Sequence, residues 1–374
     1  MVQHLVTAPE GASQPWRQRP VISLCVGVKG QLSRVLNTYL TPATHSALPA
    51  AAAPGQLSVP VLNQLRTTLG ALPQRTYHLF GASSIAMSPS PAMHNAGFKA
   101  LSLPHEYTLC AGPEGESMAD GVARVKAALS KRDCGGGNVT IPFKQEALAL
   151  VDDLSPAAKV IGAVNTLRVV QRDGSRRVEG YNTDWIGIAG PIREQLGALA
   201  SQGKSRTGKA GLVVGAGGTA RAAVYALRKI GLQAHIVNRT PEKAQSLAEE
   251  LSGKLGGHVQ AVSEPQSVEE LQDIAAVVWT VPGTAQDWAA PHVESLLQKR
   301  DAGLLPAVVV DVAYTPRDTT ASRQAEANGA VVIRGLRMLE AQGVAGFSLW
   351  TGGMAPERIM CAAAECFYDA NVPA

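Results

Sequence analysis

The sequence predicts an α/β protein of two domains, because short apolar runs alternate with segments of helical periodicity along most of its 374 residues. This alternation is typical of mostly parallel sheets that helices cover on both faces. A glycine-rich turn at residues 215–220 also follows an apolar run and opens a helical segment, as in doubly wound α/β domains. A chain of this length has room for two such cores.

The composition excludes several classes of protein. Hydrophobic residues make up 45% of the chain and charged residues 17%, the balance of a folded globular protein. The net charge of +4 is spread without a run of lysines or arginines, so no nucleic-acid partner is expected. No apolar run has the length of a membrane span, and the first ten residues lack the pattern of a signal peptide. We therefore expect a cytoplasmic protein with no membrane partner.

The cysteines predict free thiols rather than disulfides or a metal site. Their number is odd, and no two have the spacing of a zinc site or of a CxxC redox motif. They are Cys25, Cys110, Cys134, Cys361 and Cys366. A reducing compartment and no bound metal are expected from this pattern.

The first half of the chain is expected to hold a loose terminus, a short separate segment and one sheet. Residues 1–20 are polar and contain prolines, which is typical of a loosely ordered end. The elements expected after it are strands at 21–28, 76–80, 106–110 and 138–141, and helices at 59–69, 91–100, 118–129 and 142–150. The predicted division is 1–72, a sheet domain at 73–187 that helices within 338–374 complete, and a second domain at 188–337.

The second domain repeats the alternation more regularly. Its strands are expected at 212–214, 233–237, 259–262, 275–279, 308–312 and 330–333. A helix at 220–229 separates the first two strands and stops before Gly231. From about residue 339 the pattern is helical, and we expect this stretch to return and pack on the first sheet.

The turn Gly215-Ala-Gly-Gly-Thr-Ala220 predicts a bound dinucleotide. Gly215 allows a sharp turn after a buried strand, Gly217 lets the backbone approach a pyrophosphate, and Ala220 lets the helix pack on the strand. The N–H groups that open the helix would bind the anion. The expected cofactor contacts here are Gly215, Ala216, Gly217, Gly218, Thr219 and Ala220. The alternative is a turn that merely joins strand to helix, since glycine-rich turns are common.

The residues after the next strand indicate which dinucleotide is bound. NAD-binding domains place a carboxylate there for the ribose hydroxyls, whereas this chain has Asn238, Arg239 and Thr240. An arginine fork suits a 2′-phosphate, which predicts NADP as the cofactor. Lys243 is included among the expected contacts, and Thr240 before Pro241 is expected to cap the next helix.

Four short polar segments of the first domain are expected to converge on one small molecule. They contain Ser88 and Ser90, Thr140 and Lys144, Asn165, and Asp184. Because the carboxyl ends of parallel strands face one crevice, these side chains can meet there, and together they suit a polyhydroxy acid. Each also has a structural alternative, such as a helix cap for Ser90 or Asp184 and a solvated position for Lys144.

Taken together, these segments resemble shikimate dehydrogenase. The matching motifs run from about residue 77 to the C-terminus: Ser-x-Ser-Pro-x-x-His-Asn, Asn-Val-Thr-Ile-Pro-x-Lys, Gly-Ala-Val-Asn-Thr, Gly-Tyr-Asn-Thr-Asp, Gly-Ala-Gly-Gly-Thr-Ala-Arg-Ala and Gln-Gly-x-x-x-Phe-x-x-Trp-Thr-Gly. The resemblance implies NADP-dependent reduction of 3-dehydroshikimate to shikimate, in a cleft between a substrate domain and a Rossmann domain. It also implies a catalytic pair, Lys144 and Asp184, and the substrate-binding residues Ser88, Ser90, Thr140, Asn165, Tyr314 and Gln342.

The residue types of the implied pair agree with this chemistry. When a hydride reaches a ketone carbon, negative charge develops on the oxygen, and a nearby ammonium stabilises that charge and donates a proton. Lys144 is the candidate for this role. Asp184 would orient the ammonium and help to hold a substrate hydroxyl.

The N-terminal 72 residues carry a second resemblance. Gly30-Gln-Leu-Ser-Arg34 and Ala52-Ala-Pro-Gly-Gln-Leu-Ser58 look like the end of a type I 3-dehydroquinate dehydratase, and residues 103–107 resemble a junction in the fungal pentafunctional arom polypeptide. Arg34 and Gln56 match substrate-contacting positions of that dehydratase. The resemblance places its Schiff-base lysine and catalytic histidine outside this chain, so no dehydratase activity is expected. A barrel remnant cannot close its own sheet, so an apolar edge is expected. The alternatives are that the rest of the chain covers this edge, that it serves self-association or docking, or that it stays uncovered.

One loop departs from the family's pattern and leaves other functions open. The family usually has an Asn-Ala-Thr loop beside the nicotinamide, where this chain has Trp279, Thr280 and Val281, so the cofactor's geometry is harder to predict than its binding. One alternative is an inactive metabolite sensor related to fungal quinate repressors. Others are a quinate dehydrogenase or an enzyme for a related cyclic hydroxy acid. Ser90, as a serine rather than a threonine, favours shikimate over quinate.

Overall fold

The computed structural model describes residues 22–37, 41–172, 174–201, 208–299 and 307–372. The chain separates into two compact units, 1–75 with 95–106 and 76–94 with 107–374. The loose terminus expected at 1–20 lies outside the described residues. Within these ranges the five cysteines are free thiols, no three metal-ligating side chains gather, and no helix is long and apolar enough to cross a bilayer.

The first unit is built around two helices that pack on each other, α2 (Gln31–Leu36) and α3 (Val59–Thr68). Leu62 of α3 is fully buried. The side chain of Asn63 donates a hydrogen bond to the carbonyl of Leu101 at 2.8 Å. This bond ties the later segment of the unit to α3.

The strand expected at 21–28 is wrong for the residues that the structure describes. Residues 22–27 are irregular and lead into a 3₁₀ turn, η2 (Val28–Gly30). The side chain of Asn37 accepts from the N–H of Ser23 at 3.1 Å and donates to its carbonyl at 2.8 Å. The side chain of Asn37 therefore makes the hydrogen bonds that a neighbouring strand would otherwise make with this backbone.

The second unit contains two six-stranded sheets, and the first has the order β2-β1-β3-β5-β6-β4. Its strands are β1 (Thr76–Gly81), β2 (Glu106–Ala111), β3 (Cys134–Val139), β4 (Asp153–Leu154), β5 (Thr166–Arg172) and β6 (Ser175–Tyr181). β3 is parallel to β1 and antiparallel to β5. Helix α5 (Met118–Leu129) covers one face through buried residues such as Val125.

β3 begins four residues earlier than expected, because it contains three consecutive glycines, which weaken the local signal for a strand. Gly137 requires glycine: its φ is 156°, and a Cβ would lie 2.0 Å from the carbonyl oxygen of His78 on β1. The helix expected at 142–150 is reduced to a short 3₁₀ segment, η4 (Glu146–Leu150). Lys144 therefore lies on a turn between β3 and η4.

β5 and β6 form an antiparallel hairpin that the sequence did not predict. Its register pairs Thr166 with Tyr181, so the residue before β5 meets the residues after β6. The N–H of Asn165 donates to the carbonyl of Tyr181 at 3.0 Å. This register brings Asn165 beside Asp184, the first residue of α7 (Asp184–Ser201).

The second sheet is parallel throughout and has the order β12-β11-β10-β7-β8-β9. Its strands are β7 (Ala210–Val214), β8 (Gln233–Val237), β9 (Val259–Ala261), β10 (Ile274–Trp279), β11 (Val308–Asp311) and β12 (Val331–Ile333). The order reverses between β7 and β10, which is where doubly wound sheets bind ligands. The predicted α/β class with a Rossmann sheet is confirmed.

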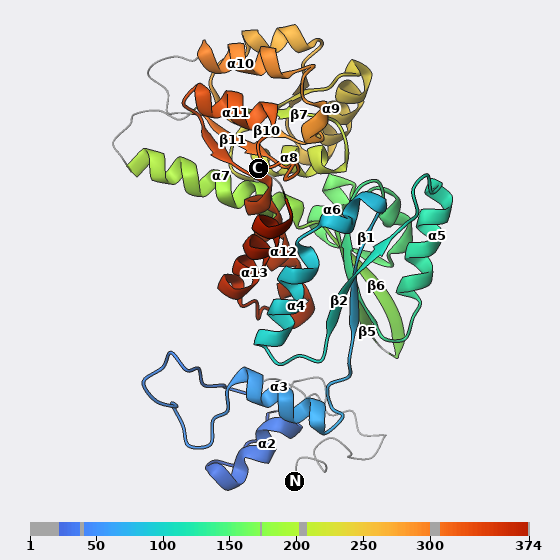
Figure 1. Cartoon of the computed structure of the whole chain (residues 1–374), viewed down its shortest axis with the longest axis vertical. Helices are drawn as coiled ribbons and strands as arrows, with labels where there is room; N and C mark the ends of the chain where they lie inside the picture. The colour runs from blue at the N-terminus through green and yellow to red at the C-terminus, as the bar shows by residue number, and fades with distance from the viewer. Residues whose placement is uncertain (1–21, 38–40, 173, 202–207, 300–306, 373–374) are drawn as a thin grey trace. The chain divides into compact units, whose positions relative to one another are not determined.

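Alternate residues of β7 face opposite helix layers, as the two-residue period of a strand requires. Val213 packs with the layer of α7, α8 and α9, whereas Leu212 and Val214 pack with the layer of α10 and α11. The new helices are α8 (Gly218–Lys229), α9 (Pro241–Leu255), α10 (Ala290–Gln298) and α11 (Thr320–Ala327). The sheet is thus buried on both faces (Figure 1).

Two C-terminal helices, α12 (Gly335–Thr351) and α13 (Glu357–Asn371), follow the Rossmann sheet. α12 lies against the first sheet (Figure 1). The indole N–H of Trp350 donates to the carbonyl of Leu167 at 3.0 Å. At Gly346 a Cβ would already lie 3.4 Å from the amide of Asn138. This close contact places Gln342 of α12 at the carboxyl ends of the first sheet's strands.

Glu340 on α12 is a buried carboxyl group with few interactions that compensate for its loss of water. Its side chain is 4% exposed, its nearest cation is Arg337 at 3.7 Å, and Oε1 has no hydrogen-bond partner among the residues described. Burial, followed by the charge of Glu365, raises the pKa of Glu340 to about 7 from its usual 4.5. Glu357 acts in the same direction, while Arg337 opposes it.

We expect the substitution Glu340→Gln to stabilise the protein at pH 8 and to have almost no effect at pH 5. The folded state binds an extra proton between the unfolded and folded pKa values, so stability falls as the pH rises through about 4.5 to 7. A neutral glutamine removes that loss, and a gain of about 1–2 kcal/mol is expected at pH 8. Urea unfolding at both pH values measures it; an equal effect at both would contradict the assignment.

Candidate active site

Lys144 and Asp184 form a shielded ion pair. Nζ of Lys144 lies 2.6 Å from Oδ2 of Asp184, and the two side chains are 11% and 4% exposed. The turn after β3 carries the lysine, and the first residue of α7 carries the carboxylate. A pair this far from water is stable only when further hydrogen bonds satisfy both partners.

Asn165 supplies the largest part of that support. Its amide donates to the second carboxylate oxygen of Asp184 at 2.8 Å, and its own carbonyl accepts the backbone N–H of Thr183 at 2.6 Å. The same amide lies 3.1 Å from Oε1 of Gln342. Donor and acceptor ends are both engaged, so the orientation of Asn165 and of the carboxylate is determined.

A buried chain of hydrogen bonds extends this support into the first sheet. The hydroxyl of Tyr107 donates to Asn138, whose amide donates to Thr166 at 3.1 Å, and Thr166 in turn donates to Asn165 at 3.0 Å. His94 stacks on Tyr107, and burial lowers the pKa of His94 to about 3, so its ring is neutral. No role was predicted for Tyr107 or Asn138 from the sequence, although Asn138 stands in the motif Asn-Val-Thr-Ile-Pro-x-Lys.

The glycine-rich turn also contacts the lysine. Nζ of Lys144 donates to the hydroxyl of Thr219 at 3.1 Å, and a Cβ on Gly218 would lie 3.1 Å from Cβ of Lys144. Asp184 and Thr219 use two of the three N–H bonds of the ammonium. Within the described part of the chain the third N–H has no partner.

One cavity of about 550 Å³ collects the residues expected to bind substrate. Its lining includes Ser88, Ser90, Thr140, Asn165, Tyr314 and Gln342 together with Lys144, Asp184 and Thr219. Lys144 is the single cation among the lining residues that the structure describes. The volume and the mixture of apolar walls with a few polar groups are those of a small-molecule site.

The two serines and the tyrosine lie together at this cavity. Ser88 donates to Ser90 at 3.1 Å, and both side chains are buried. Burial raises the pKa of Tyr314, and a hydrogen bond with Ser88 acts in the opposite direction. Ser90 is also the first residue of α4 (Ser90–Ala100), the helix that the sequence predicted to begin at residue 91.

The loop that carries Tyr314 is held by Asp311, for which no role was predicted from the sequence. Its carboxylate accepts the N–H of Ala313 at 3.0 Å and the amide of Gln286 at 2.9 Å, and it also bonds Thr319. Burial raises the pKa of Asp311. An aspartate that ends a parallel strand was the signal that could have identified it.

The glycine-rich turn has the geometry that a dinucleotide requires. Gly215 has a φ of 119°, and a Cβ there would lie 2.4 Å from the hydroxyl of Thr280. Gly217 precedes α8, and open space surrounds the position of its missing Cβ. Ala220 is fully buried where the helix packs on the sheet. Ala216 joins the two glycines and packs partly against the same core.

The residues expected at the 2′-phosphate lie between β8 and the first turn of α9. Arg239 and Lys243 are exposed and make no ion pair with any residue that the structure describes. Asn238 donates to the carbonyl of Thr240 at 3.0 Å. Thr240 occupies the N-cap position of α9 as expected, but its side chain makes no capping bond.

The loop at residues 279–281, which differs from the family's pattern, does not place its tryptophan in the cavity. Trp279 is the last residue of β10, is 1% exposed, and packs in the core beneath α10 and α11. Thr280 and Val281 line the cavity instead, and Thr280 is fixed by a hydrogen bond to Val214 at 2.8 Å. The tryptophan therefore leaves the ligand space open.

Three family profiles match the chain. The shikimate dehydrogenase substrate binding domain matches residues 80–167, and shikimate / quinate 5-dehydrogenase matches residues 198–334. Type I 3-dehydroquinase matches residues 4–73. The first two matches together cover most residues that line the polar cavity, the second covers the Rossmann sheet, and the third includes the described N-terminal segment.

Individual relatives cover most of the chain. The pentafunctional AROM polypeptide of Schizosaccharomyces japonicus is 39% identical over 91% of this chain, which spans about a fifth of that protein's length (21%). The solved dehydroquinate dehydratase and shikimate dehydrogenase from S. pombe AroM is 32% identical, with a TM-score of 0.70 over 91% of this chain and 62% of that one. Shikimate 5-dehydrogenase from Thermus thermophilus, in complex with NADP(H) and shikimate, is 34% identical, with a TM-score of 0.58 over 78% of this chain and 99% of that one.

Proposed function

Because the chain belongs to the shikimate dehydrogenase family, we propose that it reduces 3-dehydroshikimate to shikimate with NADPH. The observation that carries this proposal is the position of Lys144. Its ammonium lies in the wall of the polar cavity, pairs with Asp184, and bonds the glycine-rich turn through Thr219. One donor thus serves the substrate pocket and the cofactor turn together.

The residues present fit an NADP molecule. Gly217 leaves the backbone open to a pyrophosphate, and the first N–H groups of α8 have no partner within the helix. Arg239 and Lys243 lie beside the N-terminus of α9, where cations are unfavourable without an anion. A 2′-phosphate would supply that anion. When bound, NADPH supplies the hydride.

Lys144 supplies the proton that completes the reduction. As the hydride adds to the ketone carbon, charge grows on the ketone oxygen, and the remaining N–H of Lys144 stabilises it. Transfer of that proton to the oxygen gives the product hydroxyl, and water then reprotonates the amine. Asp184, whose two oxygens are already bonded, holds the ammonium in place.

Hydroxyl and amide groups recognise the rest of the substrate. Ser88, Ser90 and Tyr314 offer neutral donors for the carboxylate, which suits a site whose single described cation is reserved for catalysis. Asn165 and Gln342 suit the ring hydroxyls. The proposal therefore concerns a compact cyclic hydroxy acid.

Two alternatives are tested by the same assay. The matching profile names shikimate and quinate together, so quinate is the second candidate substrate. A metabolite sensor is the other, because a protein with this fold can bind a metabolite without turning it over. NADPH oxidation with 3-dehydroshikimate, and reduction of NADP or NAD with shikimate and with quinate, separates them: tight ligand binding without turnover would favour the sensor.

We expect the substitution Lys144→Ala to lower kcat about a hundredfold or more, with a modest effect on substrate binding. Loss of NADPH absorbance with 3-dehydroshikimate measures the effect. Lys126→Ala, an exposed lysine of α5 away from the cavity, is the matched control. Unchanged turnover in Lys144→Ala would remove the lysine from the mechanism.

We expect Thr219→Val to lower kcat roughly 5- to 10-fold, because it removes one hydrogen bond to the catalytic ammonium and keeps the volume. Thr219→Ser restores the hydroxyl and should restore the rate. In a Lys144→Ala background Thr219→Val should have no further effect. An equal loss in both backgrounds would mean that the hydroxyl acts through the cofactor instead.

We expect Arg239→Ser to lower kcat/KM for NADPH about 10- to 100-fold, the loss of a charge-assisted contact, and to leave kcat/KM for NADH unchanged. Parallel assays with both cofactors supply the comparison within one variant. A parallel fall with NADH would place Arg239 outside phosphate recognition.

A further inference from the structure

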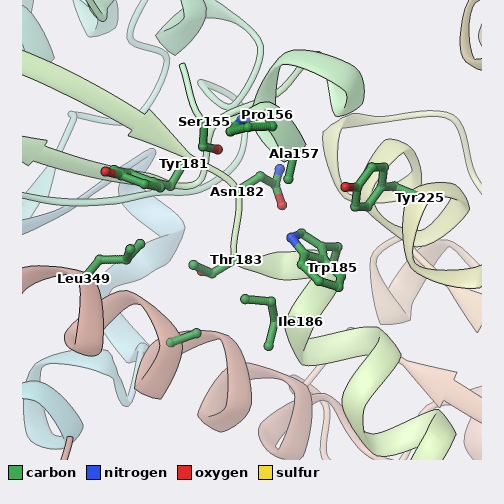
Figure 2. A pocket seen from close by; sticks show the side chains of 11 residues that line it. Ser155, Pro156, Ala157, Tyr181, Asn182, Thr183, Trp185, Ile186, Tyr225 and Leu349 are labelled. Atoms are coloured by element: carbon green, nitrogen blue, oxygen red, sulfur yellow. The ribbon is translucent and has the colours of Figure 1, made fainter. Parts of the chain in front are cut away.

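The segment from Asn182 to Trp185 separates two cavities. On one side is the cavity of Lys144 and Asp184. On the other is a cavity of about 350 Å³, here called the back pocket, formed by the start of α6 (Pro156–Ile161), the residues flanking Asp184, one residue of α8 and two of α12. Figure 2 shows its side chains. No described residue lines both cavities, so an occupant of the back pocket leaves the substrate's space free.

The lining of the back pocket selects against charged ligands. None of the described residues that line it is a lysine, arginine, histidine, aspartate or glutamate. A carboxylate or phosphate would lose water there without gaining a charged partner, which disfavours the hydroxy acid and the dinucleotide. Trp185 and Tyr225 meet edge to face with centroids 5.4 Å apart, and Leu349 lies across from them (Figure 2). Such walls suit a compact aromatic molecule.

One polar group in this lining is unsatisfied. The amide N–H of Asn182 donates to the carbonyl of Ala163 at 3.0 Å, but its Oδ1 accepts no hydrogen bond from the residues described, although the side chain is only 2% exposed. In Figure 2 this oxygen points toward the side of Trp185. A buried acceptor without a donor is costly. A single N–H or O–H on the ligand would satisfy it.

A residue that lines the back pocket is in direct contact with a group that holds the catalytic pair. Thr183 and Trp185, the two chain neighbours of Asp184, both line it. The hydroxyl of Thr183 also lies 3.0 Å from the amide of Asn165, the group that holds the carboxylate of Asp184. A molecule pressed against Thr183 therefore acts on Asp184 through one intervening side chain.

We infer that the back pocket is an effector site for a compact, uncharged aromatic molecule that carries one hydrogen-bond donor, and that its occupancy changes the rate of the reaction on the other side of Asp184. The binding half of this inference stands on the pocket alone. The rate half rests on the proposed function.

Indole and 1-methylindole form a matched pair of probes, because methylation removes the single donor and keeps the ring. Isothermal titration of the full chain should give a dissociation constant of about 1 mM or lower for indole, within the usual efficiency of so small a ligand. 1-Methylindole should bind at least about fivefold more weakly, the worth of one hydrogen bond. Indole-3-carboxylate should bind more weakly still, since its charge has no partner.

Ala345→Phe, on α12, fills the pocket and should abolish indole binding while NADP binding is retained. Ala362→Phe, an exposed position on α13, is the matched control and should bind indole normally. Should Ala345→Phe fail to bind NADP, Leu349→Trp replaces it. The site is refuted by no indole binding to the unmodified chain, by indole binding that survives the filled pocket, or by displacement of indole by shikimate.

The expected effect on the reaction rate is measured separately. Saturating indole should lower kcat for 3-dehydroshikimate at least about twofold and leave KM nearly unchanged, as expected for a ligand outside the substrate's space. An unchanged kcat at saturation overturns this half. If the unmodified chain turns over none of the candidate substrates, the proposed function has failed, and the titration still decides the site.

Discussion

The structure depends on keeping two opposite charges stable away from water. Moving an ammonium and a carboxylate out of solvent costs several kcal/mol per ion unless hydrogen bonds replace the lost water. Here Asn165 and Thr219 supply those bonds to Asp184 and Lys144. The antiparallel hairpin, the turn after the glycine strand and the opening of α8 must therefore meet at one point. None of these three elements can shift without exposing or orphaning a charge.

Small residues make this close approach of the elements possible. At Gly137 the strands approach too closely for any side chain, and at Gly218 the cofactor turn lies directly on Lys144. These glycines have different roles. Gly137 lets β3 pair with β1, and Gly218 lets the glycine-rich turn pack against Lys144. Larger residues at either place would separate groups that the chemistry needs within hydrogen-bond distance.

The Rossmann half was predictable because buried parallel strands are continuous apolar runs, and because the turn from Gly215 can be read locally. β3 was misjudged because its glycines weaken every local signal for a strand. The hairpin was missed because Arg172, Arg176 and Arg177 make its strands look like solvent-exposed loop. Motifs identified residues that the structure brings together at one cavity. The bond from Lys144 to Thr219, however, joins positions 75 apart in sequence, and no local pattern reports such a contact.

The helix α12 also carries a consequence for synthesis of the chain. Gln342 and Met338 complete a cavity whose earliest wall residue is Leu79. The chain must therefore be synthesised beyond residue 342 before this cavity is complete. Stabilisation by ligand acts only on forms that already bind it, so a nascent chain that has not yet reached α12 gains no protection from a ligand of this cavity.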